Sequence, residues 1–231
     1  MEKIDHYSCL VEAPVIASQI LENYKRDRSY FEQYSTKFDD KFLVHFEENV
    51  DTLFHLTPLQ ELKKEIEEKN EIILITIHHF LPLLNVTKAL MLKAINIPDQ
   101  SDINVFLNQL GESVNKRCVW EIQRNCRKLV DEMELHVEEL IDKGFVLRIL
   151  NDFNQLMGKL KKCESDLADV TYRHDKVATE YSLINNQLAD VVETIVESVP
   201  AVLGEHDPAK SEEYSIERMM TQIQFRRSES H

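Results

Sequence analysis

The chain has 231 residues, enough for one substantial core or two smaller ones, and 29% of its residues are charged. Only four glycines and six prolines interrupt it, so the composition favours long helices joined by short connections. The formal net charge of −14 argues against a general nucleic-acid binder, because phosphate contacts need clustered Lys and Arg side chains. This charge favours a basic or a neutral partner instead.

The N-terminal sequence MEKIDHYSCLVEAP lacks a basic start followed by an apolar core, so it predicts no secretory signal. We therefore expect a cytoplasmic protein. The four cysteines form no CxxC pair, and two of them stand eight residues apart on one expected helix. Free thiols are expected at all four positions: Cys9, Cys118, Cys126 and Cys163.

The first part of the chain predicts an arm and two amphipathic helices. Residues 1–11 are expected to form a flexible arm, and a helix is expected from Pro14 to about Lys37. Its larger apolar residues recur at helical spacing: Ile16, Ile20, Tyr24, Phe31 and Tyr34. Asp39 and Asp40 are suitable caps for a second helix, because a short carboxylate side chain can accept hydrogen bonds from the free N–H groups of a first turn.

A long third helix is expected over Thr57–Ile97. Thr57 is a suitable N-cap, and Pro58 fits the first helical position because its missing N–H needs no partner there. The apolar residues that follow stand mostly three, four or seven apart, and Pro82 should kink the helix. The segment Ile72–Ile97 is apolar enough to suggest a membrane span, but its two histidines, two lysines and two asparagines favour burial in a bundle.

Glycine residues indicate where the helices in the middle of the chain end. A short helix is expected over residues 102–110 and should stop at Gly111. A strongly amphipathic helix is expected over residues 112–143 and should stop at Gly144.

The last long stretch, from Phe145 to about Val202, predicts two consecutive helices. A break is expected somewhere between Tyr172 and Thr179. After this stretch, Asp207-Pro208 offers an N-cap and a first helical residue. The remaining chain is expected to be only weakly held.

A shift of 107 residues aligns apolar residues of the two halves of the chain. The aligned pairs include Phe46 with Phe153, Leu53 with Leu160, Ile77 with Ile184, Leu81 with Leu188 and Leu84 with Val191. Any two amphipathic helices match at some offset, but chance matches should slip across the intervening loop. We therefore favour an internal duplication.

The predicted fold class is all-α, an elongated antiparallel helical bundle of two pseudo-repeated three-helix halves. The first half should occupy residues 12–110 and the second residues 111–206. Residues 207–231 should form a short C-terminal helix and a tail.

Three short motifs carry a family resemblance: Phe38-Asp39-Asp40-Lys41-Phe42-Leu43, then Gly144-Phe145, then Asp207-Pro208-Ala209-Lys210. With these motifs the chain resembles, over residues 38–214, a family of uncharacterised bacterial helical proteins built from two related halves. The aromatic segment expected after Leu110 is replaced here by Gly111-Glu112-Ser113. The resemblance implies the fold and no activity.

His78 and His79 are the most conspicuous polar insertion in the apolar third helix. Adjacent residues point about 100° apart on a helix, so the pair cannot easily share one metal ion. A structural interpretation is that one histidine is buried with a hydrogen bond and the other lies at the edge of the helix packing. The functional interpretation is that the pair contacts a ligand or senses pH.

The sequence predicts no metal site, no cofactor and no enzymatic activity. None of the nine histidines follows an acid by three residues, which excludes the Glu-x-x-His ligands of di-iron bundles. Glu132, His136 and Glu139 share a helix face by spacing, among many carboxylates on what we expect to be a solvated surface. The glycines are too scattered for a phosphate-binding loop, and no Gly-x-Ser-x-Gly motif is present.

Trp120 has two possible roles. If it faces solvent it would form an interface hot spot, whereas a lone Trp at a helical core position usually serves packing, which is the interpretation we favour. The same expectation of a core position applies to four tyrosine and phenylalanine residues: Tyr24, Tyr30, Phe31 and Tyr34.

We expect a non-enzymatic protein-interaction or structural module that buries a helix or apolar edge of a protein partner, or of a second copy, against exposed apolar residues. One alternative is an apolar small-molecule site between helices near His78, His79 and Pro82. Another is a membrane-active protein that exposes Ile72–Ile97 on conversion. Neither nucleic acid nor a membrane is the expected partner.

Overall fold

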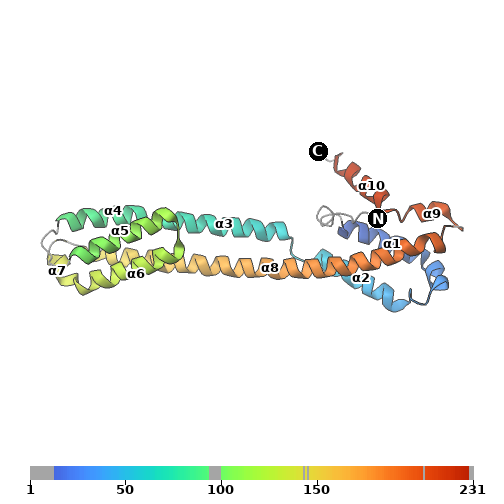
Figure 1. The fold of residues 1–231 in the computed structure, drawn as a ribbon, viewed down its shortest axis with the longest axis horizontal. Coiled ribbons are helices and arrows are strands. Elements are labelled where there is room, and N and C mark those ends of the chain that lie inside the picture. Colours follow the sequence, from blue (N-terminus) through green and yellow to red (C-terminus); the bar gives the residue numbers. More distant parts are fainter. Residues whose placement is uncertain (1–12, 94–99, 143, 145, 205, 229–231) are drawn as a thin grey trace. The chain divides into compact units, whose positions relative to one another are not determined.

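The computed structural model describes residues 13–93, 100–142, 144, 146–204 and 206–228, and these residues form helices and short connections without any strand (Figure 1). The all-α fold class is therefore confirmed. The predicted N-terminal arm and Cys9 lie outside the described residues. The apolar spacing of three and four residues explains the result, because it places one buried stripe on each helix.

The chain divides into two compact units. Unit 1 combines residues 1–58 with residues 175–231, and unit 2 consists of residues 59–174. Helix α8, Arg148–Val202, contributes residues to both. This division follows spatial contacts, whereas the predicted halves, 12–110 and 111–206, follow sequence repetition and stay a prediction.

Unit 1 contains α1 (Ala13–Tyr34), α2 (Asp40–His55), the C-terminal part of α8, α9 (Pro208–Glu212) and α10 (Ile216–Ser228). Its core is rich in aromatic rings that pack edge to face, with the ring centroids of Phe31 and Phe38 5.2 Å apart. The prediction of a weakly held C-terminal segment is wrong for Tyr214 and Met219, which are both buried in this core. Burial of so many rings explains why two short helices stay attached.

Side-chain caps define two helix starts in unit 1, as the sequence predicts. The Asp39 carboxylate accepts a hydrogen bond of 3.0 Å from the Phe42 N–H at the start of α2. Asp207 accepts one of 3.2 Å from the Lys210 N–H at the start of α9, where Pro208 occupies the first turn. Each cap satisfies an N–H group that has no partner within its helix.

Unit 2 contains α3 (Leu59–His78), α4 (Phe80–Lys93), α5 (Gln100–Lys116), α6 (Val119–Leu135), α7 (Val137–Asp142) and the N-terminal part of α8. Residues from all of these helices contribute to one apolar core. Its buried polar side chains are satisfied: Thr76 and Thr87 donate to carbonyl groups four residues earlier, and Asn125 donates to the Ser113 hydroxyl at 2.8 Å.

The predicted long third helix is interrupted at His79, between α3 and α4. The His79 N–H is shared between the carbonyl groups of Ile75 and Thr76, at 3.3 and 3.2 Å. Pro82 explains why the helix is interrupted here. In a continuous helix its ring would collide with the carbonyl of residue 78, and it has no N–H to donate to that carbonyl. Pro82 therefore lies in the first turn of α4, where a missing N–H is tolerated.

The helix boundaries predicted around Gly111 are wrong. Helix α5 continues through Gly111 to Lys116, and the next helix begins at Val119 instead of residue 112. The real stop is Arg117, whose φ of 55° is left-handed. The N–H groups of Arg117 and Cys118 bond to the carbonyl groups of residues 114 and 113, a Schellman cap formed without the usual glycine.

The predicted break between Tyr172 and Thr179 is also wrong, because α8 is one helix of 55 residues. Between Gly158 and Pro200 the sequence has neither glycine nor proline, so nothing interrupts the backbone hydrogen bonds. The polar residues of this stretch are mostly exposed and need no loop to reach solvent.

Candidate functional site

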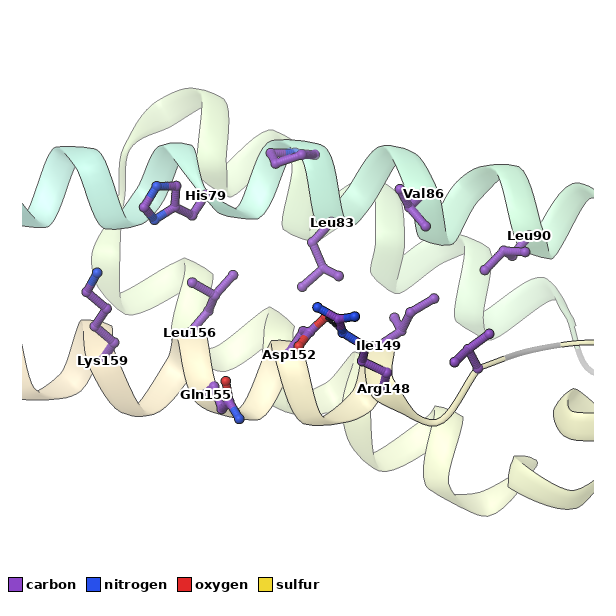
Figure 2. A pocket seen from close by; sticks show the side chains of 12 residues that line it. His79, Leu83, Val86, Leu90, Arg148, Ile149, Asp152, Gln155, Leu156 and Lys159 are labelled. Carbon is purple, nitrogen blue, oxygen red and sulfur yellow. Dashed lines mark ion pairs between the residues drawn. The ribbon is translucent and has the colours of Figure 1, made fainter.

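A groove of about 610 Å³ lies in unit 2 between α4 and the N-terminal part of α8 (Figure 2). Apolar side chains dominate its walls, and polar groups stand between them. The lining residues are His79, Pro82, Leu83, Val86, Leu90, Val146, Arg148, Ile149, Asp152, Gln155, Leu156 and Lys159.

Helical spacing produces both walls. On α4, Leu83, Val86 and Leu90 are three and four residues apart and therefore share one face. On α8, Asp152 and Leu156 follow the same spacing. Figure 2 shows Leu83 and Leu156 reaching from their two helices into the space between them.

The groove is shallow and open along its length. Val86 is 51% exposed, while Ile149 is buried in the core below. Phe80 and Phe153 belong to the same core, with ring centroids 6.5 Å apart. A rigid apolar floor with exposed apolar walls can bind a complementary apolar face without rearranging the helices.

The polar groups of the groove include two cations, Arg148 and Lys159. Arg148 and Asp152, one turn apart on α8, form an ion pair of 3.7 Å between Nε and Oδ2. Lys159 forms no ion pair with any other described residue. An acidic group on a ligand would therefore find an uncompensated cation at this position.

Of the two histidines singled out from the sequence, the structure places only His79 in the groove. His78 ends α3 and does not line it. Both side chains are exposed, so the expected buried histidine is not found at either position.

Trp120 does not take the expected core position, since it is 62% exposed in the first turn of α6. The guanidinium carbon of Arg124 lies 4.7 Å from the centre of its ring. For the other aromatic residues the core expectation is right for Tyr24 and Phe31 and wrong for Tyr30 and Tyr34, which are exposed.

Sequence reasoning missed most of the groove residues. A usable signal was present, because α4 carries more apolar residues than one buried stripe requires: Phe80, Leu81, Leu83, Leu84, Val86, Leu90 and Met91. A surface helix that is apolar over most of its circumference indicates a second contact surface.

Unit 1 holds a buried carboxylate, Asp27, whose side chain is 1% exposed. It accepts hydrogen bonds from Arg26 at 2.5 and 3.1 Å and from the Tyr214 hydroxyl at 3.2 Å, and Lys210 Nζ lies 3.2 Å away. Burial opposes ionisation of Asp27, but the bonds from Arg26 and Lys210 outweigh it and lower its pKa. Because each carboxylate oxygen is engaged, this cluster fixes α9 to α1 and leaves no carboxylate for acid–base chemistry.

Three side chains with metal-ligating chemistry meet on α6 and α7. His136 Nε2 lies 3.5 Å from Glu132 and Nδ1 lies 3.8 Å from Glu139. Within the part of the chain that the structure describes, no group of three or more His, Cys, Asp or Glu side chains is placed to hold a metal ion. The arrangement suits ion pairs with a protonated imidazole.

By length and composition alone, one helical stretch in the described ranges, Asp40–Met91, could cross a membrane. Within this stretch, a segment of 18 consecutive residues has a mean hydropathy of 1.4, and 33% of that segment is buried. The apolar segment that begins at Ile72 contributes to this result: Ile73 and Ile77 are buried in the core, whereas Ile72 and Ile75 are exposed. A single such stretch is weak evidence for a membrane protein.

No known protein family, curated protein or solved structure matches this chain. The resemblance to a family of bacterial helical proteins therefore stays a prediction.

Proposed function

We propose that this protein is a non-enzymatic interaction module that binds an amphipathic helix of a partner protein in the groove between α4 and α8. The observation that carries the proposal is the open apolar groove on an otherwise charged chain. Binding of this kind needs only shape, apolar area and a few charges, all of which the groove residues supply.

The dimensions of the groove fit a helix. From His79 to Leu90 the groove wall advances 11 residues, which is about 16 Å or roughly three helical turns. A partner helix of that length would present apolar anchors at positions i, i+3 and i+7, which is the spacing of Leu83, Val86 and Leu90 on α4.

The charged side chains of the groove predict which residue type lies beside the apolar stripe of the partner helix. Arg148 is already paired with Asp152, so Lys159 is the cation that a partner can still neutralise. We therefore expect an acidic residue on the partner helix beside its apolar stripe. An exposed pair of this kind adds modestly to affinity and sets the orientation of the helix.

A small apolar molecule is the second candidate, because a volume of about 610 Å³ lies within the range of ligand pockets. Such pockets bury most of their ligand, however, and the exposed wall at Val86 and Val146 leaves one side open. Native mass spectrometry of protein purified from its own source separates the candidates. A retained mass of a few hundred daltons that Val86→Asp removes would favour the small molecule.

Peptide display tests the helix proposal. A random library of peptides about 16 residues long, or roughly four turns, is selected on the full chain and counter-selected on Val86→Asp. The proposal predicts enriched peptides with an amphipathic helical pattern and an acidic flank. Val105→Asp, at a 46% exposed position of α5, is the matched control and should keep binding them.

The helix proposal fails if the enriched peptides bind wild type and Val86→Asp equally. It also fails if the enriched peptides show no helical periodicity. Circular dichroism of both variants, with wild-type spectra expected, confirms that a charge at an exposed position leaves the fold intact.

We also propose that the halves 12–110 and 111–206 are related by duplication within a helical bundle. Burial supports this, because four of the aligned pairs are buried at both positions, although Leu81 is only half-buried where Leu188 is buried: Phe46 and Phe153, Leu53 and Leu160, Ile77 and Ile184, and Leu84 and Val191. Selection on a shared ancestral pattern would preserve such pairs. Folding of the isolated half 111–206 into a helical monomer or dimer would support duplication, and a disordered fragment would count against it.

A further inference from the structure

A basic surface surrounds Trp120 on unit 2. Its five cations lie at the turn between α5 and α6 and along α6, and all five are exposed: Lys116, Arg117, Arg124, Arg127 and Lys128. Between Val114 and Val130 the only acidic residue is Glu121. This concentration of positive charge contrasts with the formal net charge of −14 for the whole chain.

Helical spacing gathers these side chains on one face. Trp120, Arg124 and Arg127 stand at positions i, i+4 and i+7 of α6, and Lys128 is adjacent. The left-handed residue Arg117 ends α5 and leads directly into this face. From Trp120 to Lys128 the surface therefore follows α6 for about 12 Å.

Among the residues that the structure describes, no carboxylate pairs with the cations of this surface. None of the five cations forms an ion pair with another residue of the described ranges. Two of them lie over aromatic rings, with Arg124 at 4.7 Å from Trp120 and Lys128 at 5.9 Å from Phe106. The Nε–H of Arg124 donates to Asn125 Oδ1 at 3.4 Å, and stacking on the ring leaves the remaining N–H groups of this guanidinium free to donate.

We propose that the surface formed by Lys116, Arg117, Trp120, Arg124, Arg127 and Lys128 docks an acidic segment of a partner protein, with Trp120 as its apolar anchor. Trp and Arg are the residue types that dominate interface energetics, and the exposed ring supplies contact area between the cations. None of these residues lines the groove, so this surface goes beyond the proposed function.

The charge distribution favours a short acidic segment over an extended polyanion. The helical part of the surface covers only about 12 Å, whereas nucleic acids and anionic membranes present charge over much longer distances. The formal net charge of −14 means that the rest of the chain would repel such long partners beyond this surface. A peptide of alternating acidic and apolar residues matches both the cations and Trp120.

Because Trp120 is the only tryptophan of the chain, its fluorescence reports on this surface alone. The full chain is titrated with a synthetic peptide of alternating Glu and Leu residues at physiological salt. We expect saturable quenching or a spectral shift, and affinity that weakens as salt increases. In Arg124→Glu/Arg127→Glu the affinity should fall about tenfold or more, as expected when two contacts become repulsive.

Lys41→Glu/Lys63→Glu is the matched control, because it makes the same change in net charge at two exposed lysines that are not among the six residues of this surface. It should change the affinity by less than about twofold. Equal losses in both double variants would overturn the proposal, as would failure of the peptide to bind at about 1 mM.

The same titration is repeated with a single-stranded oligonucleotide and with vesicles containing phosphatidylserine. The proposal predicts weaker binding to both than to the peptide. Tighter binding of either, abolished by Arg124→Glu/Arg127→Glu, would overturn the acidic protein segment and identify that polyanion as the ligand class.

Discussion

Replacing Asp27 by Asn tests whether the buried carboxylate holds the C-terminal helices of unit 1 to α1. The side chain is 1% exposed and contacts Arg26, Lys210 and Tyr214. Hydrogen bonds to charged groups contribute about 1.5–3 kcal/mol each, and breaking a fully buried ion pair costs about 3–5 kcal/mol. Because Arg26 is 44% exposed and Lys210 is 30% exposed, water compensates part of the loss, so we expect a destabilisation of about 2–3 kcal/mol.

The assay is urea unfolding followed by circular dichroism, for wild type, Asp27→Asn and the control Asp40→Asn. Asp40 also contacts an arginine, but its side chain is 88% exposed, so the control should unfold close to wild type. Equal stability of wild type and Asp27→Asn at neutral pH would refute the assigned role.

The pH dependence gives an independent check on Asp27. The pKa of Asp27 is lower in the folded than in the unfolded protein. Its contribution to the free energy of unfolding is therefore fully present above the unfolded carboxyl pKa of about 4. The contribution is lost as pH falls through the lowered folded pKa. The stability difference between wild type and Asp27→Asn should therefore shrink on acidification, and a constant difference from pH 7 to pH 2 would contradict the argument.

Three further predictions concern packing and reactivity. Phe153→Ala should destabilise the protein by about 3–5 kcal/mol in urea unfolding, because the ring is fully buried, whereas Leu183→Ala at an exposed position should stay within about 0.5 kcal/mol. Gly204→Ala should lower the thermal midpoint, because the added Cβ would lie 2.3 Å from the carbonyl oxygen of residue 200, and an unchanged midpoint would contradict that geometry. Burial raises the pKa of Cys126 to about 12, so mass spectrometry should find it unalkylated by iodoacetamide at pH 8 in the folded protein and alkylated in urea.

Local signals in the sequence predict local structure well. Asp39 and Asp207 are recognisable caps because a short carboxylate beside a first turn has few better hydrogen-bonding arrangements. Pro82 indicates a disruption for a similar reason, although the chain breaks at His79, three residues earlier. These features depend on contacts within one helical turn.

The features that sequence reasoning missed depend on tertiary context. Arg117 takes a left-handed conformation that glycine would usually signal, while Gly111 is carried within α5 by the packing of its neighbours. The groove has two walls about 65 residues apart in the chain, and no local pattern pairs Leu83 with Leu156. The exposure of Trp120 likewise depends on which face of α6 meets the core.

Methyl NMR most directly tests the central claim, that the groove between α4 and α8 receives a partner helix. The Leu and Val methyl groups of the full chain are observed during titration with the peptide enriched by display. The account predicts shifts at Leu83, Val86, Leu90 and Leu156, and none at the exposed residues Val44 and Leu183 of unit 1. Shifts confined to residues outside the groove, or spread evenly over both units, would contradict it.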